Sequence, residues 1–428
     1  MSLLAINGGE KVRTKLFPRY NNISQNEIDA VNKVLTTGIL SKYLGAWCDD
    51  FYGGETVQNF EKAWSKKFNS KYSIAVNSNT SGLIAALGAC EIGLGDEVIV
   101  SPYSMSISAT APLFYNATPV FCDLDKNTYS FDTEMLKSVI TKNTKAIVIV
   151  HIFGCPSNMD EIIQIARENN LYIIEDCAQA PGATYKGNQV GTLGDIGVFS
   201  LNYHKHIHTG EGGMCTTNSE KLANKMQLIR NHAESIVEAK GEIELKNMIG
   251  FNFRLTEIQA AIGLEQLNKL DDELFIRQKY AKMYDEALTS FDFIKASIFE
   301  DRTHSYYIQA FRFDEKKAGI TREQYINAVK AELSVVELRE KEGVPIYCGY
   351  VRPLYLLPIF QNKLAYTQKG FAFKDNINYE KGICPNVEQL HYKELFTHDL
   401  TRSPLSLDDV NDVIKAYVKV AENINELK

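Results

Sequence analysis

The chain has little of what would mark a nucleic-acid-binding, membrane or exported protein. Its 428 residues include 46 Lys and Arg against 53 Asp and Glu, and the net charge of −7 offers no basic surface for nucleic acid. No apolar run approaches the roughly 20 residues that a bilayer-spanning helix needs. The first residues lack the long apolar core of a signal peptide. We therefore expect no nucleic-acid partner, no membrane insertion and no export.

Cysteine pairs and two common nucleotide-binding motifs are also missing. The eight cysteines are scattered without a Cys-x-x-Cys pair, which argues against a zinc site and a disulfide framework. Reduced thiols in a cytoplasm fit this pattern best. No Gly-x-Gly-x-x-Gly follows a predicted strand, which disfavours a nicotinamide enzyme, and no Gly-Lys-Ser/Thr forms a Walker loop.

Short apolar segments that alternate with helical patterns organise the first half of the chain. Strands are predicted over 73–76, 97–100, 119–123, 146–151 and 171–176. This alternation predicts an α/β fold with a mostly parallel sheet covered on both faces, which binds ligands at the carboxyl ends of its strands. Helices are predicted over 256–270 and 271–289, and residues 290–428 mix short strands and helices as a smaller α+β unit. The chain is too long for one ordinary core.

One lysine lies in a segment, residues 194–213, that opens with an apolar run and ends in a glycine cluster. In a partly desolvated pocket, Lys205 would act as an amine nucleophile; the alternative is a surface lysine in a buried glycine-rich loop. His204, His206 and His208 alternate around it, as metal ligands on one face of a strand would. No matching Cys or carboxylate ligand set lies nearby, so we expect no metal site.

Three further polar segments fall where such a sheet would gather them. Residues 77–82 form a polar turn into a helix, where free N–H groups either bind phosphate or make an ordinary N-cap. Asp176 and Gln179 follow a buried strand, where the carboxylate either holds a proton on a ring nitrogen or caps the next turn. Residues 250–257 form a polar-aromatic loop that, taken alone, indicates a helix cap.

Together these segments resemble the DegT/DnrJ/EryC1/StrS sugar aminotransferases, a family of fold-type I enzymes that use pyridoxal phosphate. The resemblance runs from Asn26 to the C-terminal helix and is strongest over 73–270. The matching pieces are Ala75–Thr80, Ala117–Phe121, Ile174–Ala180, Phe199–Ser200 with Lys205 and Thr209–Gly213, and Asn252–Arg254.

The resemblance implies a large cofactor-binding domain over 20–270 with a sheet of the seven-stranded type. It also implies a small C-terminal domain over 271–428, with residues 1–19 packing against the body. Lys205 would bind the cofactor covalently and move the proton between cofactor and substrate carbons. The remaining cofactor contacts implied are Asp176 to the pyridine nitrogen, Gln179 to the ring hydroxyl, Asn79, Thr80 and Ser200 to the phosphate, and Asn252 to the phosphate of the other subunit of a homodimer.

The chain departs from the family pattern at several positions. Asn79 stands where the family commonly has glycine, and Pro181 where it commonly has histidine. Met105 aligns with the aromatic residue that stacks on the cofactor ring, with Tyr103 two residues away, and a thioether also packs on rings. Residues 43–54 form a longer segment than expected, which shapes either a substrate pocket or a dimer contact.

The implied activity is a cytoplasmic transamination. L-Glutamate would convert the cofactor to its pyridoxamine form, which would aminate a keto or aldehyde sugar, expected to be nucleotide-linked, for amino-sugar or surface-polysaccharide biosynthesis. One alternative is a sugar dehydratase, in which histidine replaces the cofactor-binding lysine. The spacing from Ser200 and from Gly210 puts Lys205, and not a histidine, at the cofactor-binding position, which disfavours this alternative. Another is a non-catalytic cofactor-binding regulator, although no appended DNA-binding domain is recognisable.

Overall fold

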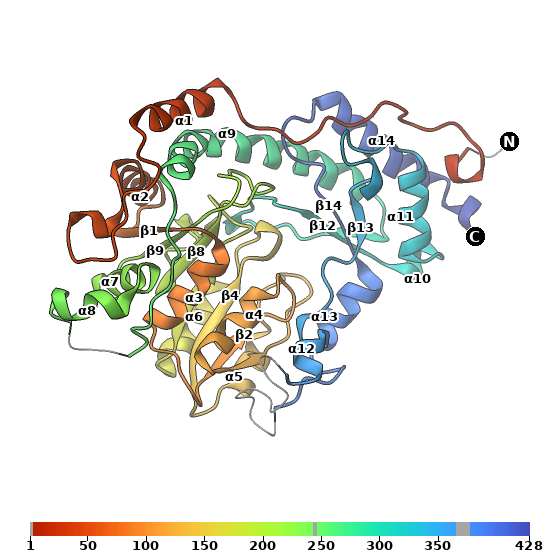
Figure 1. Cartoon of the computed structure of the whole chain (residues 1–428). Coiled ribbons are helices and arrows are strands. Elements are labelled where there is room, and N and C mark those ends of the chain that lie inside the picture. Colours follow the sequence, from red (N-terminus) through yellow and green to blue (C-terminus); the bar gives the residue numbers. More distant parts are fainter. Residues whose placement is uncertain (1–2, 243–245, 365–376) are drawn as a thin grey trace.

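A seven-stranded sheet forms the centre of the larger part of the protein (Figure 1). The computed structural model describes residues 3–242, 246–364 and 377–428. The strand order is β1-β9-β8-β5-β4-β2-β3, in which β1 and β9 pair antiparallel, β9 and β8 pair antiparallel, and the other pairs are parallel. The strands are β1 (Tyr72–Val76), β2 (Glu97–Val100), β3 (Thr118–Phe121), β4 (Thr144–Val150), β5 (Tyr172–Asp176), β8 (Ile196–Ser200) and β9 (Gly213–Thr217). The expected α/β fold with a mostly parallel sheet is confirmed.

Helices cover both faces of this sheet because successive strand side chains point to opposite sides. Phe199 of β8 and Met214 of β9 pack in one apolar cluster with α2 and α9. Their neighbours Val198 and Cys215 pack in another, with α3 and α7. The helices of the larger part are α1 (Gln25–Thr37), α2 (Glu55–Phe68), α3 (Asn79–Ala89), α4 (Ile107–Thr110), α5 (Thr133–Val139), α6 (Met159–Glu168), α7 (Glu220–Arg230), α8 (Ala233–Lys240) and α9 (Glu257–Leu288).

Helix α9 is one continuous helix where two were expected, over 256–270 and 271–289. Thr256 caps its N-terminus in a capping box with Gln259. After Gly263 the helix contains neither glycine nor proline, so nothing in its sequence breaks it. It passes through the expected boundary at 270/271 and contributes side chains to both parts of the protein.

The smaller part is built on an antiparallel sheet of order β10-β12-β14-β13. The elements after α9 include β10 (Ile294–Ala296), β12 (Gln309–Phe313), α10 (Glu315–Ala318), α11 (Arg322–Ala331), β13 (Ile346–Cys348), α12 (Pro358–Gln361), α13 (Pro385–Gln389), β14 (Leu395–His398) and α14 (Leu407–Glu422), of which α12 and α13 pack on the larger part. A third, small sheet joins β11 (Arg302–Thr303) to β6 (Thr184–Tyr185) and β7 (Asn188–Gln189). This last sheet ties the two parts together.

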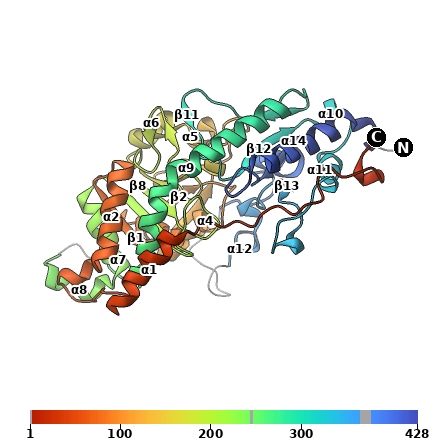
Figure 2. The same cartoon turned by 90° about the horizontal axis from the view of Figure 1, so that it is seen from above.

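The N-terminal segment runs from the smaller part to α1 (Figures 1 and 2). Leu4 and Phe17 are fully buried in the core of the smaller part, and Arg13 forms ion pairs with Asp409 and Asp412 of α14. The segment therefore lies against the smaller part before it reaches the larger one.

Part of the C-terminal half packs back on the large sheet. The N–H of Leu354 donates to the carbonyl of Pro102 at 2.7 Å, and the hydroxyl of Tyr379 donates to the carbonyl of Pro119 at 2.6 Å. Leu354, Phe360 and Tyr379 are buried in the core of the larger part. This segment thus covers the side of the sheet that ends in β3. Among the described residues, no helix combines the length and the apolar character of a membrane span.

Candidate active site

A cavity of about 270 Å³ opens at the carboxyl ends of β4, β5 and β8. It lies where a parallel sheet is expected to bind its ligand. Seven of the residues predicted from the sequence line it: Asn79, Thr80, Met105, Asp176, Gln179, Ser200 and Lys205. The fold therefore brings together segments separated by as much as 126 positions along the chain.

Lys205 lies in the turn that follows β8, with its side chain in the cavity. The residue is 6% exposed, and its amine lies 4.0 Å from the centre of the Tyr307 ring. Its backbone N–H donates to Asn202, and its carbonyl accepts the hydroxyl of Tyr20 at 2.9 Å. Burial lowers the pKa of Lys205 to about 8, although the charge of Asp176 opposes the shift. A fixed lysine that readily loses its proton is suited to nucleophilic and proton-transfer chemistry.

Asp176 ends β5 on the opposite wall and is held by three donors. Oδ2 accepts the Ser108 hydroxyl at 2.7 Å, and Oδ1 accepts the Ala178 N–H at 3.1 Å and the Asn79 amide at 3.3 Å. Burial raises the pKa of Asp176, while the hydrogen bonds and the charge of Lys205 lower it. A buried carboxylate that remains open to the cavity is a strong partner for a cationic ring nitrogen.

The N-terminus of α3 forms a cradle for an anion beside these two residues. The Ser78 hydroxyl caps the helix by accepting the N–H of Ser81 at 3.1 Å, and Thr80 and Ser200 line the cavity. The side-chain amide of Asn79 donates to Asp176 and to the carbonyl of Val198. The main-chain N–H of Asn79 is therefore the group of this residue that can bind an anion. The unpaired N–H groups of a first helical turn and the helix dipole favour phosphate at this position.

Glycine is required where β9 begins beside the cradle. A Cβ at Gly213 would lie 2.6 Å from the carbonyl carbon of Ser78, closer than real Cβ contacts. The glycine cluster at the end of the lysine segment therefore lets β9 approach the start of α3.

Gln179 is oriented by two contacts across the cavity. Its Oε1 accepts the N–H of Phe153 at 2.7 Å, and its Nε2 donates to the Tyr350 hydroxyl at 3.2 Å. Tyr350 belongs to the smaller part of the protein, so the cavity is closed by both parts.

Met105 and Tyr103 have different positions. Met105 lines the cavity and is 55% exposed. Tyr103 is 1% exposed, and its hydroxyl accepts the N–H of Tyr350 at 2.8 Å and lies 3.1 Å from Nδ1 of His391. Of the two, Met105 is the side chain placed to meet a ligand in the cavity.

Asn252 lies outside the cavity wall. It is exposed, its Oδ1 accepts from Arg254 at 2.7 Å, and its carbonyl accepts from the side chain of Asn77 at 3.3 Å. Residues 43–54 also lie outside the wall, held in part by the Asn231 amide, which donates to the carbonyl of Leu44 at 2.8 Å.

The three alternating histidines have separate environments. His206 is buried and donates from Nε2 to the carbonyl of Ser305 at 2.9 Å. His208 accepts the N–H of Gly210 on Nδ1 at 3.3 Å. His204 lines the cavity. Their contacts differ and do not converge on one point.

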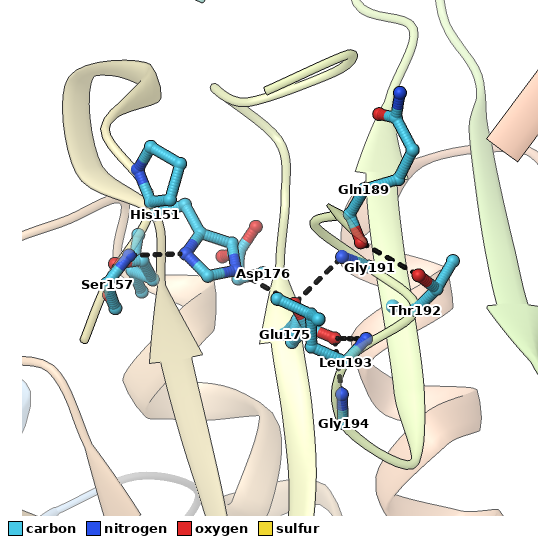
Figure 3. A network of polar contacts seen from close by, with 12 residues as sticks. His151, Ser157, Glu175, Asp176, Gln189, Gly191, Thr192, Leu193 and Gly194 are labelled. Atoms are coloured by element: carbon cyan, nitrogen blue, oxygen red, sulfur yellow. Dashed lines mark hydrogen bonds and ion pairs between the residues drawn. The ribbon is translucent and has the colours of Figure 1, made fainter. Parts of the chain in front are cut away.

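A buried network behind the cavity fixes the loop that leads into β8 (Figure 3). The carboxylate of Glu175 accepts the N–H groups of Gly191 and Leu193 at 2.8 Å and of Gly194 at 2.6 Å. His151 accepts an N–H from Ser157 on Nδ1, so its proton is on Nε2, which donates to Glu175 at 3.0 Å. Four donors satisfy this charge in the interior, and the loop is thereby fixed relative to β5.

Sequence reasoning missed several cavity residues. Ser104 lines the cavity, and Ser108, which is buried and donates to Asp176, is one turn beyond it in a serine-rich segment, a spacing that could have suggested a shared face. Tyr307 and Tyr350 come from the smaller part, more than 100 positions after Lys205, and no local pattern marks them.

Known proteins resemble the chain over most of its length. The model of the DegT/DnrJ/EryC1/StrS aminotransferase family matches residues 22–401. The spore coat polysaccharide biosynthesis protein SpsC of Bacillus subtilis is 35% identical over 404 residues, which cover 92% of this chain and 94% of SpsC. The GDP-perosamine synthase of Caulobacter vibrioides is 39% identical over 307 residues, 71% of this chain and 78% of that protein.

A solved structure agrees with these sequence matches. The aminotransferase from Psychrobacter cryohalolentis superimposes with a TM-score of 0.81 at 32% identity, covering 96% of this chain and all of that one. Together with the lysine, carboxylate and helix N-terminus that meet in one cavity, these matches show that the chain belongs to the DegT/DnrJ/EryC1/StrS aminotransferase family.

Proposed function

We propose that this protein is a pyridoxal-phosphate-dependent aminotransferase that moves the amino group of L-glutamate onto a keto or aldehyde sugar carried on a nucleotide. The observation that carries the proposal is the arrangement of Lys205, Asp176 and the α3 N-terminus around one cavity. The product would be an amino sugar for polysaccharide or related biosynthesis, as the names of the two relatives suggest.

The residues present fit the cofactor of this family. Pyridoxal phosphate supplies an aldehyde for covalent attachment and a protonated ring that withdraws electrons from the substrate. Asp176 would hold the ring nitrogen, Lys205 the aldehyde carbon, and Gln179 the ring hydroxyl. Thr80, Ser200 and the N–H groups of α3 would hold the phosphate, and Met105 would lie against the ring.

Lys205 would then act as both base and acid. Its lowered pKa allows the amine to accept a proton from a substrate carbon and to return it on the neighbouring atom at near-neutral pH. Tyr307 fixes the position of the amine from below, and the backbone contacts to Tyr20 and Asn202 fix the turn. Burial excludes the water that would compete for that proton.

We also propose a homodimer in which Asn252 reaches the phosphate of the partner's site. Asn252 is exposed and outside its own cavity. A set of large apolar residues is also exposed on α1 and the following segment: Ile28, Leu35, Ile39, Leu40, Leu44 and Trp47. Such exposure is typical of an interface. A cytoplasmic location would suit the eight cysteines, all of which are free.

Two half-reactions test the function. The protein loaded with pyridoxal phosphate should show the absorbance band of the lysine-bound cofactor, and L-glutamate should remove that band. Each of a panel of keto and aldehyde sugars, free and nucleotide-linked, is then scored for restoring the band, and GDP-perosamine is tested as an amino donor in reverse. Lys205→Ala is the control and should give no band. The proposal would be contradicted if the wild-type protein formed the band but neither glutamate removed it nor any sugar restored it.

The same experiment separates the dehydratase alternative. A dehydratase would release no amino sugar and would have histidine in the position of the lysine. Here Lys205 is the residue whose amine is in the cavity, while His206 is turned toward Ser305.

A further inference from the structure

His204 differs from its two neighbouring histidines in having uncommitted ring nitrogens. His206 and His208 each use one nitrogen for a hydrogen bond within the chain. His204 is half-buried in the cavity wall, and neither of its nitrogens has a hydrogen-bond partner among the described residues. A polar ring in a binding cavity with no internal partner is available to a ligand.

Two tyrosines hold the ring of His204 beside the lysine. The Tyr203 ring lies 4.8 Å away and nearly perpendicular, and the Tyr307 ring lies 6.1 Å away at 36°. Tyr307 also lies under the amine of Lys205 at 4.0 Å. His204 and Lys205 therefore share one aromatic support, and a substrate at the lysine lies within the same cavity as the imidazole.

His204 is a neutral ring at physiological pH. Burial, together with the smaller effects of Lys205, Arg402, Arg339 and His208, lowers its pKa to about 4. A neutral imidazole offers one donor and one acceptor, which matches a hydroxyl group that also does both. It brings no positive charge for a carboxylate, and the aromatic rings beside it suit the C–H faces of a sugar.

We propose that His204 is a specificity-determining residue that hydrogen-bonds a hydroxyl of the sugar acceptor. The inference rests on the proposed function and assigns a side chain to its second substrate. The contact involves no covalent step, because His204 neither gains nor loses a proton in it.

The test compares the two half-reactions in matched variants. His204→Phe keeps an aromatic ring between the tyrosines but cannot hydrogen-bond, and His204→Asn keeps a donor and an acceptor. The sugar identified with the wild-type protein is the probe. In His204→Phe we expect the KM for this sugar to rise roughly ten-fold, the effect of one lost hydrogen bond, with the glutamate half-reaction within about two-fold of wild type. His204→Asn should recover part of the loss.

His208→Phe is the control on the same segment and should keep the wild-type ratio of the two half-reactions. An unchanged sugar KM in His204→Phe would overturn the inference, as would an equal loss in both half-reactions, which would indicate a general effect on the lysine. Failure of the proposed function is distinct, because the wild-type protein itself would then aminate no sugar.

Discussion

Replacing Glu175 by glutamine should destabilise the protein through a single buried carboxylate. Glu175 is fully buried, and each of its oxygens accepts two hydrogen bonds: Oε1 from Leu193 and Gly194, and Oε2 from Gly191 and His151. Glutamine retains one oxygen but places an NH2 group against two donors. Two hydrogen bonds to a charged acceptor are lost, and two donors are left unsatisfied.

The magnitude follows from these contacts. A hydrogen bond to a charged group contributes about 1.5–3 kcal/mol, so the loss of two costs about 3–6 kcal/mol. The unfolding entropy of a 428-residue chain is roughly 0.9 kcal/mol/K, which converts this cost into a drop in Tm of about 3–7 °C. Because the loop fixed by Glu175 leads into β8, the affinity for pyridoxal phosphate should fall as well.

Differential scanning calorimetry of the apo protein measures the effect directly. Glu168→Gln is the matched control, since Glu168 is exposed and accepts one bond from Gln164. This control should change the free energy of unfolding by less than about 0.5 kcal/mol. With this entropy, a shift of 1 °C corresponds to about 1 kcal/mol. If the Tm of Glu175→Gln lies within 1 °C of the wild-type value, the buried carboxylate does not stabilise the loop as stated.

Three further predictions concern the cavity. In the apo protein, the rate of covalent modification of Lys205 should rise with pH as the amine loses its proton, with a midpoint near pH 8. Asp176→Asn should lower that midpoint, because the Asp176 carboxylate raises the pKa of Lys205. A midpoint near the ordinary lysine pKa would show that burial does not lower the pKa of Lys205. Ser108→Ala removes the 2.7 Å bond to Asp176 and should weaken pyridoxal phosphate binding at least ten-fold, since a hydrogen bond to a charged group is worth about 1.5–3 kcal/mol; an unchanged Kd in equilibrium titration would refute it. Tyr280→Phe loses one 2.9 Å bond from its hydroxyl to a carbonyl and should cost about 1 kcal/mol of stability, and Tyr20→Phe loses its bonds to the Lys205 carbonyl and from the Asn22 amide, both 2.9 Å, and should cost about 1–2 kcal/mol. Only Tyr20→Phe should slow the glutamate half-reaction, and equal rates would show that Tyr20 does not position Lys205.

Five of the seven strands of the large sheet were predicted, because their signals are local, whereas β8 and β9 were not predicted as strands. Runs such as residues 97–100 and 172–176 are apolar and bounded by polar or turn-forming residues, which defines a buried strand without reference to the rest of the chain. The cofactor of the family was predictable for a different reason, since several short segments recur in a fixed order. The roles of the individual site residues stay predictions.

The parts that were not predictable depend on tertiary contacts. The sequence shows Tyr307 and Tyr350 as two tyrosines among 22, and only the docking of the two parts places them in the cavity. Likewise, Asn79 was expected at the phosphate, but its side chain reaches across to Asp176 because the end of β5 lies beside the start of α3. The expected division into helices over 256–270 and 271–289 was wrong, because the residues on both sides of 270/271 are compatible with one helix and none of them is glycine or proline.

Peptide mapping shows which lysine binds the cofactor. The protein is loaded with pyridoxal phosphate, reduced with borohydride, digested and analysed by mass spectrometry. We expect the reduced cofactor on the peptide that contains Lys205. Attachment to another lysine, or no attachment in a protein that shows the absorbance band, would contradict it.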